Sequence, residues 1–444
     1  MEMKEPLCLI ACTTNNKLMV NQEALKILSS FEQPVVVVSI VGKYRTGKSY
    51  LMNRLAGKNK GFPLGCTIQS ETKGIWMWCV PHPHKDDHTL VLLDTEGLGD
   101  VKRGDENYDT WIFILAVLLS STLIYNSMGT IDNDAIMKLQ FVTTISDHIK
   151  VRSSCKDEDS QYADFFPSFV WVVRDFHLDL SIDGKCIPPD EYLENSLTLK
   201  EGESEQISSY NAPRECIRKY FPSRKCFVFK LPVPHGKLNT LEKLKNADLD
   251  PVFVKQTSEF CNYILSCGGK TVFTGESTIT GSMLATLVKT YVEAIQKGQV
   301  PCLENAVVAL CQLKNFAAVE KSYALYRQLL GERVLLPTET QEELDRVHED
   351  CKKEALQEFM ASSFKDDDQR YQNELLSHIN DEYEKKCTDN RDLSMNHCTD
   401  LLNRIFGRLA PGCFIRKGGY EAYKAKQNAL IQEYRRSPGR GIEV

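Results

Sequence analysis

The spacing of hydrophobic positions changes partway along the chain, and the change predicts two regions of different architecture. From Pro34 to about Leu231, short apolar runs alternate with helical segments, which is typical of a mostly parallel sheet flanked by crossover helices. The runs lie at Val35–Val41, Gly74–Val80, Thr89–Leu93, Leu123–Tyr125, Phe169–Val173 and Cys226–Leu231. This first region is predicted to be α/β.

From about Pro301 the apolar positions recur at three- and four-residue intervals, which predicts an all-helical region. One stripe contains Leu303, Ala306, Leu310, Leu313 and Ala317, and a second contains Leu344, Val347, Cys351, Leu356 and Phe359. Thr338 and Gln341 have the spacing of a capping box, so a helix is expected to begin there. Turn residues further on divide this region into four or five helices.

Length and composition are those of a folded protein with two domains, predicted at residues 1–300 and 301–444. The formal charge of 54 − 60 = −6 argues against a non-specific nucleic-acid binder, which would be basic. The longest apolar stretch, Trp111–Tyr125, is interpreted as a buried helix running into a strand rather than as a transmembrane anchor. The first residues, Met1–Pro6, do not resemble a signal peptide, so we expect a cytoplasmic protein.

The sixteen cysteines contain no C-x-x-C pair, which favours reduced thiols in an intracellular protein. Zinc binding by Cys387, His397 and Cys398 is the alternative, but no second pair of ligands stands at finger-like spacing.

The strongest motif is Gly42–Ser49, which reads GKYRTGKS and lies between a buried strand and a helical segment. It fits the phosphate-binding pattern G-x-x-x-x-G-K-[ST], in which the two glycines let backbone amides point at phosphate oxygens. Lys48 is expected along the β and γ phosphates and Ser49 on Mg²⁺.

Asp94-Thr95-Glu96-Gly97 ends the strand Thr89–Leu93, where a nucleotide enzyme holds magnesium through an aspartate and lets a glycine amide approach the γ phosphate. D-x-x-G after a hydrophobic strand indicates a GTPase more than an ATPase. Between the two motifs, Thr72 is a candidate magnesium ligand in a switch segment. The alternative for Ser70–Gly74 is a solvated loop whose hydroxyls cap a turn.

The common N-K-x-D guanine motif is absent, and Arg174-Asp175 follows the strand Phe169–Val173 instead. Asp175 can accept both the N1 and N2 protons of guanine, a pairing that adenine does not offer.

Together, GKYRTGKS, QSETKGIW, LLDTEGLGD and VVRDF resemble the interferon-inducible guanylate-binding proteins, large GTPases related to the dynamins and atlastins. The resemblance continues through Pro301–Ala306 and Ser363–Asp366 and covers nearly the whole chain. It implies a P-loop GTPase domain followed by a helical domain, with GTP hydrolysed in a Mg²⁺-dependent reaction to GDP. Glu71 stands where several members carry His, which leaves further cleavage to GMP open.

The resemblance also assigns roles to single residues. Arg45 matches an internal arginine finger, Ser70 a serine that helps to place the attacking water, and Glu96 a glutamate of the proton and water network; these three are the candidate catalytic residues. Thr72 and Ser49 match the magnesium ligands. The candidate nucleotide-binding residues are Gly42, Lys43, Tyr44, Arg45, Thr46, Gly47, Lys48, Ser49, Tyr50, Asp94, Gly97, Arg174 and Asp175.

The resemblance further implies a nucleotide-dependent homodimer through the GTPase domain, hetero-oligomers with related members, recruitment to membranes through partners, and a role in innate defence. Family members continue into longer helical regions, some with a prenylation signal, whereas this sequence has no C-a-a-X cysteine, so a truncated form or a short isoform is expected. Two other functions stay open: a slow nucleotide-gated interaction module, and a membrane-remodelling machine like the atlastins. The lack of an apolar span argues against the latter acting alone.

Overall fold

The computed structural model divides into two compact units, residues 1–310 and 311–444, and each is described by itself. It describes residues 2–13, 17–64, 73–99, 106–137, 139, 166–271, 278–299, 301, 303–364, 366, 368–409, 411–415, 417–438 and 440–442. The predicted domain boundary between residues 300 and 301 stays a prediction.

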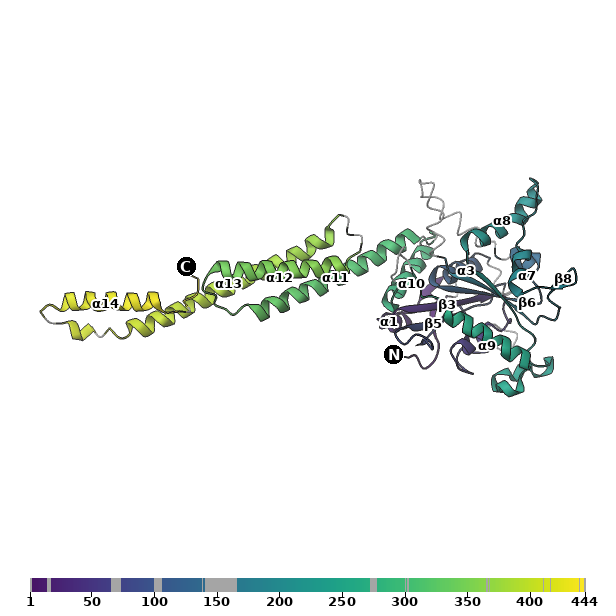
Figure 1. Cartoon of the computed structure of the whole chain (residues 1–444), viewed down its shortest axis with the longest axis horizontal. Helices are drawn as coiled ribbons and strands as arrows, with labels where there is room; N and C mark the ends of the chain where they lie inside the picture. The colour runs from purple at the N-terminus through teal and green to yellow at the C-terminus, as the bar shows by residue number, and fades with distance from the viewer. Residues whose placement is uncertain are drawn as a thin grey trace. The chain divides into compact units, whose positions relative to one another are not determined.

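The first unit is built on an eight-stranded sheet in the order β10-β7-β6-β3-β5-β4-β1-β2 (Figure 1). The strands are β1 (Leu7–Cys12), β2 (Leu18–Val20), β3 (Val35–Gly42), β4 (Ile75–Pro81), β5 (Thr89–Thr95), β6 (Thr122–Met128), β7 (Ser168–Arg174) and β10 (Arg224–Val228). A separate hairpin joins β8 (Ser181–Ile182) to β9 (Lys185–Cys186).

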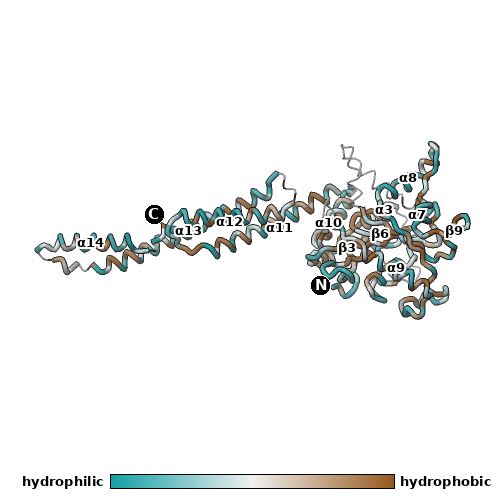
Figure 2. Tube along the Cα trace, in the orientation of Figure 1, coloured by the Kyte–Doolittle hydropathy of each residue, from teal (hydrophilic) through white to brown (hydrophobic). Residues whose placement is uncertain are grey.

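Five neighbouring strands, from β10 to β5, run parallel, which confirms the predicted mostly parallel sheet. Every residue of β3 is buried, and Figure 2 shows a hydrophobic trace along β3 and β6. β4 differs because it runs antiparallel to β5. The connection His82–His88 is too short for the crossover of a dozen or more residues that a parallel pair needs.

Helices flank the sheet, as expected of an α/β unit. They are α1 (Gln22–Ser29), α2 (Lys48–Leu55), α3 (Glu106–Leu119), α4 (Asn133–Met137), α7 (Pro189–Ser196), α8 (Glu205–Tyr220), α9 (Pro251–Ser266) and α10 (Gly281–Gln296), with the 3₁₀ segments η2 (His235–Lys243) and η3 (Asn246–Asp248). The apolar stretch Trp111–Tyr125 forms the end of α3 and the start of β6, which confirms its interpretation as a helix running into a strand. Within the described ranges, no helix is both long and apolar enough to cross a bilayer.

The region after Pro301 is helical, as predicted. Its elements in the described ranges are α11 (Leu303–Arg333), α12 (Gln341–Ser362), α13 (Arg370–Phe406), η4 (Pro411–Phe414) and α14 (Gly419–Arg436), of which α11 begins in the first unit. The core of the second unit contains Val319, Tyr326, Cys351, Phe359 and Leu375.

Two details of the helical prediction were wrong. Leu313 and Ala317 are exposed, because α11 turns Ala318 and Val319 toward the core instead. The N-cap of α12 is Thr340, whose side chain accepts from the amide of Glu343 at 3.3 Å, rather than Thr338.

Thr338 is displaced from the capping role because α13 binds it. Its Oγ1 accepts from Nδ2 of the buried Asn390 at 2.8 Å, and its amide donates to Asn390 Oδ1 at 2.9 Å. A tertiary contact, invisible to local spacing, therefore decides where α12 begins.

A buried histidine lies between α11, α12 and α13. His348 Nδ1 is 2.9 Å from the hydroxyl of Tyr326, and its ring stacks on Tyr383 with centroids 3.9 Å apart. Burial lowers the pKa of His348, against the opposing effect of nearby Glu349. The neutral imidazole is thus the form that fits this core.

Candidate functional site

The candidate site lies at the carboxyl ends of the parallel strands, where α/β folds place their ligands. The loop Gly42–Ser49 leaves the buried strand β3 and enters α2, whose first residue is Lys48. β5 and β6 lie on either side of β3, and β7 lies beyond β6. The ends of four strands therefore surround the loop.

Unusual backbone angles shape the loop. Gly42 has φ +149°, and a Cβ there would lie 2.1 Å from the carbonyl oxygen of Asn126. Gly47 has φ +78° and is the N-cap of α2. Arg45 is exposed and adopts φ 62°, a left-handed conformation that costs a non-glycine residue roughly 1 kcal/mol or more. The loop is held in a curled form that turns the start of α2 toward the site.

Lys48 is buried, with 7% of its surface exposed. Its Nζ donates to the carbonyl oxygens of Gly42 and Lys43, both at 3.2 Å. Burial lowers the pKa of Lys48 to about 8, although the charges of Asp94 and Glu96 favour its protonated form. An ammonium group held away from water inside a curled loop is well suited to bind an anion.

Ser49 and Asp94 bring together the ends of the loop and of β5. The hydroxyl of Ser49 donates to Oδ2 of Asp94 at 2.5 Å, and Asp94 is fully buried. A hydroxyl beside a carboxylate is an oxygen donor set that suits Mg²⁺. In the described ranges, no group of three or more His, Cys, Asp and Glu side chains is placed to hold a metal, and this covers Cys387, His397 and Cys398.

Gly97 allows the segment after β5 to lie against the loop. A Cβ on Gly97 would come within 2.2 Å of the Cα of Tyr44, and the amide of Leu98 donates to the carbonyl of Gly42 at 3.0 Å. Two segments that are distant in sequence therefore pack backbone to backbone.

Glu96 is buried and makes two hydrogen bonds through one carboxylate oxygen. Its Oε2 accepts from the amide of Gly74 at 2.9 Å and from the hydroxyl of Tyr108 at 3.0 Å. The carboxylate thus joins the start of β4 to α3 in this structure.

Arg174 lies beneath Gly47. It is 4% exposed, and its Nε and Nη1 make no hydrogen bond to any residue that the structure describes. The guanidinium carbon is 5.3 Å from the ring centre of Phe229 and 5.6 Å from that of Phe253, and burial lowers the pKa of Arg174. A Cβ on Gly47 would lie 3.3 Å from Nη1, so the guanidinium is next to the loop.

Asp175 follows at the end of β7 with φ 55° and is partly exposed. Its neighbour Phe176 is fixed by a backbone hydrogen bond to Phe229 at 2.8 Å. Asp175 therefore lies between the end of β7 and a residue whose backbone is fixed.

Asn126 is a site residue that the sequence interpretation missed. It is fully buried at the end of β6, and its Nδ2 donates to the carbonyl of Thr46 at 2.9 Å. The available signal was an amide directly after the apolar run Leu123–Tyr125, in the strand next to the one that carries the loop.

The remaining predicted residues are placed as follows. Thr46 and Tyr50 are buried, and Lys43 is exposed. Ser70 and Thr72, and with them Glu71, lie outside the described residues. The structure therefore brings together the loop, Asp94, Gly97 and Arg174, and the predicted roles of all these residues stay predictions.

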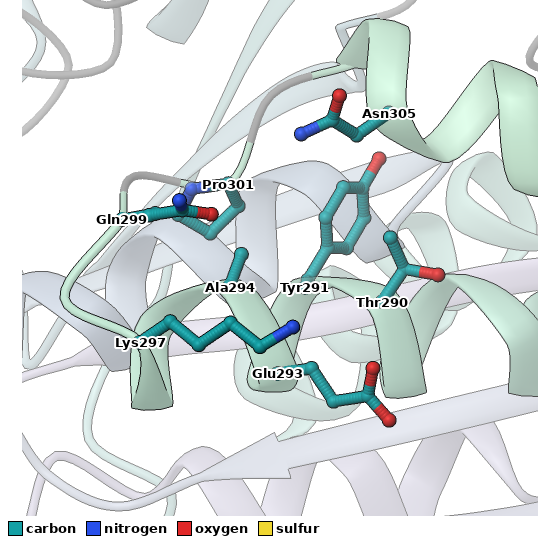
Figure 3. A pocket seen from close by; sticks show the side chains of 8 residues that line it. All are labelled: Thr290, Tyr291, Glu293, Ala294, Lys297, Gln299, Pro301 and Asn305. Atoms are coloured by element: carbon teal, nitrogen blue, oxygen red, sulfur yellow. The ribbon is translucent and has the colours of Figure 1, made fainter.

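A separate cavity of about 140 Å³ lies at the end of α10 and the start of α11 (Figure 3). It is lined by Thr290, Tyr291, Glu293, Ala294, Lys297, Gln299, Pro301 and Asn305. None of these residues belongs to the phosphate loop or its neighbours.

Comparison with known proteins gives a family for the whole chain. The model of the guanylate-binding protein N-terminal domain matches residues 15–273, and that of the guanylate-binding protein C-terminal domain matches residues 275–444. The chain is 51% identical to guanylate-binding protein 1 of Chlorocebus aethiops and to guanylate-binding protein 1 of Homo sapiens, in both cases over 100% of this chain and 76% of the relative. It is also 51% identical to human guanylate-binding protein 2, over 99% of this chain and 76% of that protein.

These matches span both structural units, and about half of the aligned residues are identical. The phosphate loop, Asp94–Gly97 and Arg174-Asp175 all lie inside the region that the N-terminal domain model matches. The chain therefore belongs to the guanylate-binding protein family.

Proposed function

We propose that the chain binds GTP with Mg²⁺ at the loop Gly42–Ser49 and hydrolyses it to GDP, with hydrolysis accelerated when two GTPase domains dimerise. Membership of the family makes the chain a GTP-binding GTPase. The observation that supports binding of the phosphates and Mg²⁺ at this loop is that the buried Lys48 and the Ser49–Asp94 pair lie at the same curled segment.

The phosphates fit the loop. Amides at the start of α2 and the ammonium of Lys48 would surround the β and γ phosphates, replacing the two carbonyl contacts that Lys48 now makes. Ser49 would hold Mg²⁺ directly and Asp94 through water, with Thr72 as the proposed second hydroxyl. When bound, the metal neutralises negative charge on the phosphate oxygens.

The base fits the end of β7. The Asp175 carboxylate would accept the N1 and N2 protons of guanine, which selects against adenine. Arg174 would support this end of the site from beneath Gly47, since it packs against Phe229 and Phe253.

Arg45 is the residue that we propose to respond to dimerisation. Its exposure on the loop lets it move toward the phosphates when a second GTPase domain covers the site, with Ser70 and Glu96 ordering the attacking water. An arginine that offsets the charge of the transferring phosphoryl group contributes roughly 10³-fold or more to the rate. Hetero-oligomers with related proteins would use the same face.

The setting that we propose is interferon-induced innate defence in the cytoplasm, with recruitment to membranes or vesicles through partners. Residues 1–300 would act as the GTPase domain and residues 301–444 as the helical domain that transmits its state. This part of the proposal rests on the family alone.

The experiment is turnover per site measured as protein concentration rises. A specific rate that climbs with concentration, and that collapses in Arg45→Ala while nucleotide affinity stays near normal, supports the dimer enzyme. Full stimulated activity in Arg45→Ala would refute the proposed role of Arg45 as an arginine finger. Chromatography of the same samples decides whether GMP follows GDP.

A flat and very low rate would instead favour the alternative, a nucleotide-gated module whose helical domain docks partners. In that case the loop and Asp175 would still bind guanine nucleotide, and hydrolysis would only time the release of the partner.

A further inference from the structure

Arg54, in the last turn of α2, joins three segments of the first unit. Its Nε donates to the hydroxyl of Tyr50 at 3.1 Å, and its Nη1 donates to Asn59 Oδ1 at 2.9 Å. Its Nη2 donates to Oδ1 of Asn246, which is remote in sequence. The guanidinium uses its planar fork in three directions at once, which a lysine ammonium on the same stem cannot reproduce.

Asn246 belongs to residues 232–250, a long excursion between β10 and α9 that contains η2 and η3. The neck of the excursion is closed by the backbone, where the amide of Asp250 donates to the carbonyl of Pro232 at 2.8 Å. Asn246 itself is exposed, so the contact with Arg54 is a side-chain tether away from that neck.

The excursion begins and ends beside the predicted base site. Phe229, just before it, and Phe253, just after it, both lie against the Arg174 guanidinium. The ring of Tyr50, to which Arg54 is bonded, lies 6.0 Å from that of Phe253. Arg54 therefore contacts Tyr50, which packs on Phe253, which in turn lies against Arg174. Through Nη2, Arg54 also binds Asn246 of the excursion.

We propose that Arg54 is a positioning residue for guanine-nucleotide binding, which fixes the arrangement of residues 232–250 next to the end of β7, where Arg174 and Asp175 lie. This rests on the proposed nucleotide site. Arg54 acts through Asn246 and Tyr50 rather than by touching the nucleotide. Without the tether, the excursion samples more conformations. The apparent dissociation constant then equals the intrinsic one divided by the fraction of molecules that hold the binding-competent arrangement, so it rises as that fraction falls.

The test uses the full chain and four variants: Arg54→Ala, Arg54→Lys, Asn246→Ala and the double variant Arg54→Ala/Asn246→Ala. The dissociation constant and dissociation rate of N-methylanthraniloyl-GDP are measured by stopped-flow fluorescence. Loss of a partly exposed hydrogen bond to a charged group predicts a rise in dissociation constant of about threefold to tenfold, mostly through faster release. The double variant should be no worse than the more affected single variant, because the two residues share one contact.

A kinetic readout separates positioning from a general loss of structure. The variants should raise KM for GTP while kcat at saturating GTP and high protein concentration stays within about twofold. The thermal midpoint of the nucleotide-free protein should not change for Asn246→Ala, because its side chain is exposed.

Lys58→Ala is the matched control. Lys58 is an exposed cation just after α2 that pairs with Glu2 at 3.7 Å instead of with the excursion, so its loss should leave the dissociation constant unchanged. Wild-type affinity in Asn246→Ala, additive losses in the double variant, or wild-type affinity in Arg54→Lys would overturn the inference. If the wild-type chain itself fails to bind the labelled GDP, the proposed function fails instead.

Discussion

Replacing Asn126 with alanine tests how the phosphate loop is kept in shape. The side chain is fully buried and carries the hydrogen bond from β6 to the carbonyl of Thr46, a residue with 4% of its surface exposed. Removing a donor from a buried acceptor costs about 1–3 kcal/mol. Because Thr46 lies between Arg45 and Gly47, the cost falls on the part of the loop that has to point its amides at phosphate.

The magnitude for binding follows from that cost. If the loop of Asn126→Ala relaxes when empty and must be reordered by nucleotide, the dissociation constant for labelled GDP rises by a factor of up to about 5–150. If the loop instead stays in place, the same free energy appears as lower stability in urea unfolding of the nucleotide-free protein. The two measurements together account for the lost hydrogen bond.

Asn126→Asp serves as the comparison. It keeps the shape but replaces the donor with an acceptor that faces the carbonyl of Thr46 and adds a buried charge, so its loss should exceed that of the alanine variant. Wild-type affinity together with wild-type stability in Asn126→Ala would refute the reasoning, as would an aspartate tolerated better than alanine.

The remaining predictions concern the close contact between Gly97 and Tyr44 and the protonation of the buried His348. Gly97→Ala should weaken GDP binding at least about tenfold, because its methyl group would meet the backbone of Tyr44, whereas Gly268→Ala, with open space around it, should bind normally in the same titration. The free energy of unfolding should fall as the pH is lowered below about 6.5, because the unfolded chain protonates His348 while burial holds its folded pKa lower, with a slope of up to about 1.4 kcal/mol per pH unit. His348→Gln should flatten that slope in urea titrations between pH 7 and pH 5, and an unchanged slope would exclude His348 as its source.

The sheet was largely predictable because its central strands are buried on both faces. β3, β5 and β7 each contain a run of four or more apolar residues and β6 a shorter one, which is typical of strands covered on both faces. β2 was missed because it is a three-residue strand at the edge of the sheet, and β1, between β2 and β4, because only its two central residues are buried, so neither has a strong pattern. The direction of β4 depended on a connection length rather than on its own residues.

Candidate site residues could be named from the sequence where a motif has a fixed spacing along one segment, and their roles stay predictions. The loop and Asp94–Gly97 could be read directly because each motif follows its strand. Asn126 and the packing of Arg174 could not, because a hydrogen bond from β6 and a cation held between Phe229 and Phe253 depend on which strands become neighbours. The start of α12 was predicted at Thr338 instead of Thr340 for the same reason, because Thr338 is hydrogen-bonded to Asn390 of α13.

Glu96 has a consequence for how the site can be observed. One oxygen of its carboxylate accepts from the Gly74 amide and the Tyr108 hydroxyl, so a rearrangement that draws this oxygen away from the start of β4 would break the hydrogen bond from Gly74. The Gly74 amide would then exchange its hydrogen with solvent more rapidly. The hydrogen-exchange rate of the Gly74 amide therefore reports, without a label, whether the Glu96 carboxylate still binds that amide or has released it.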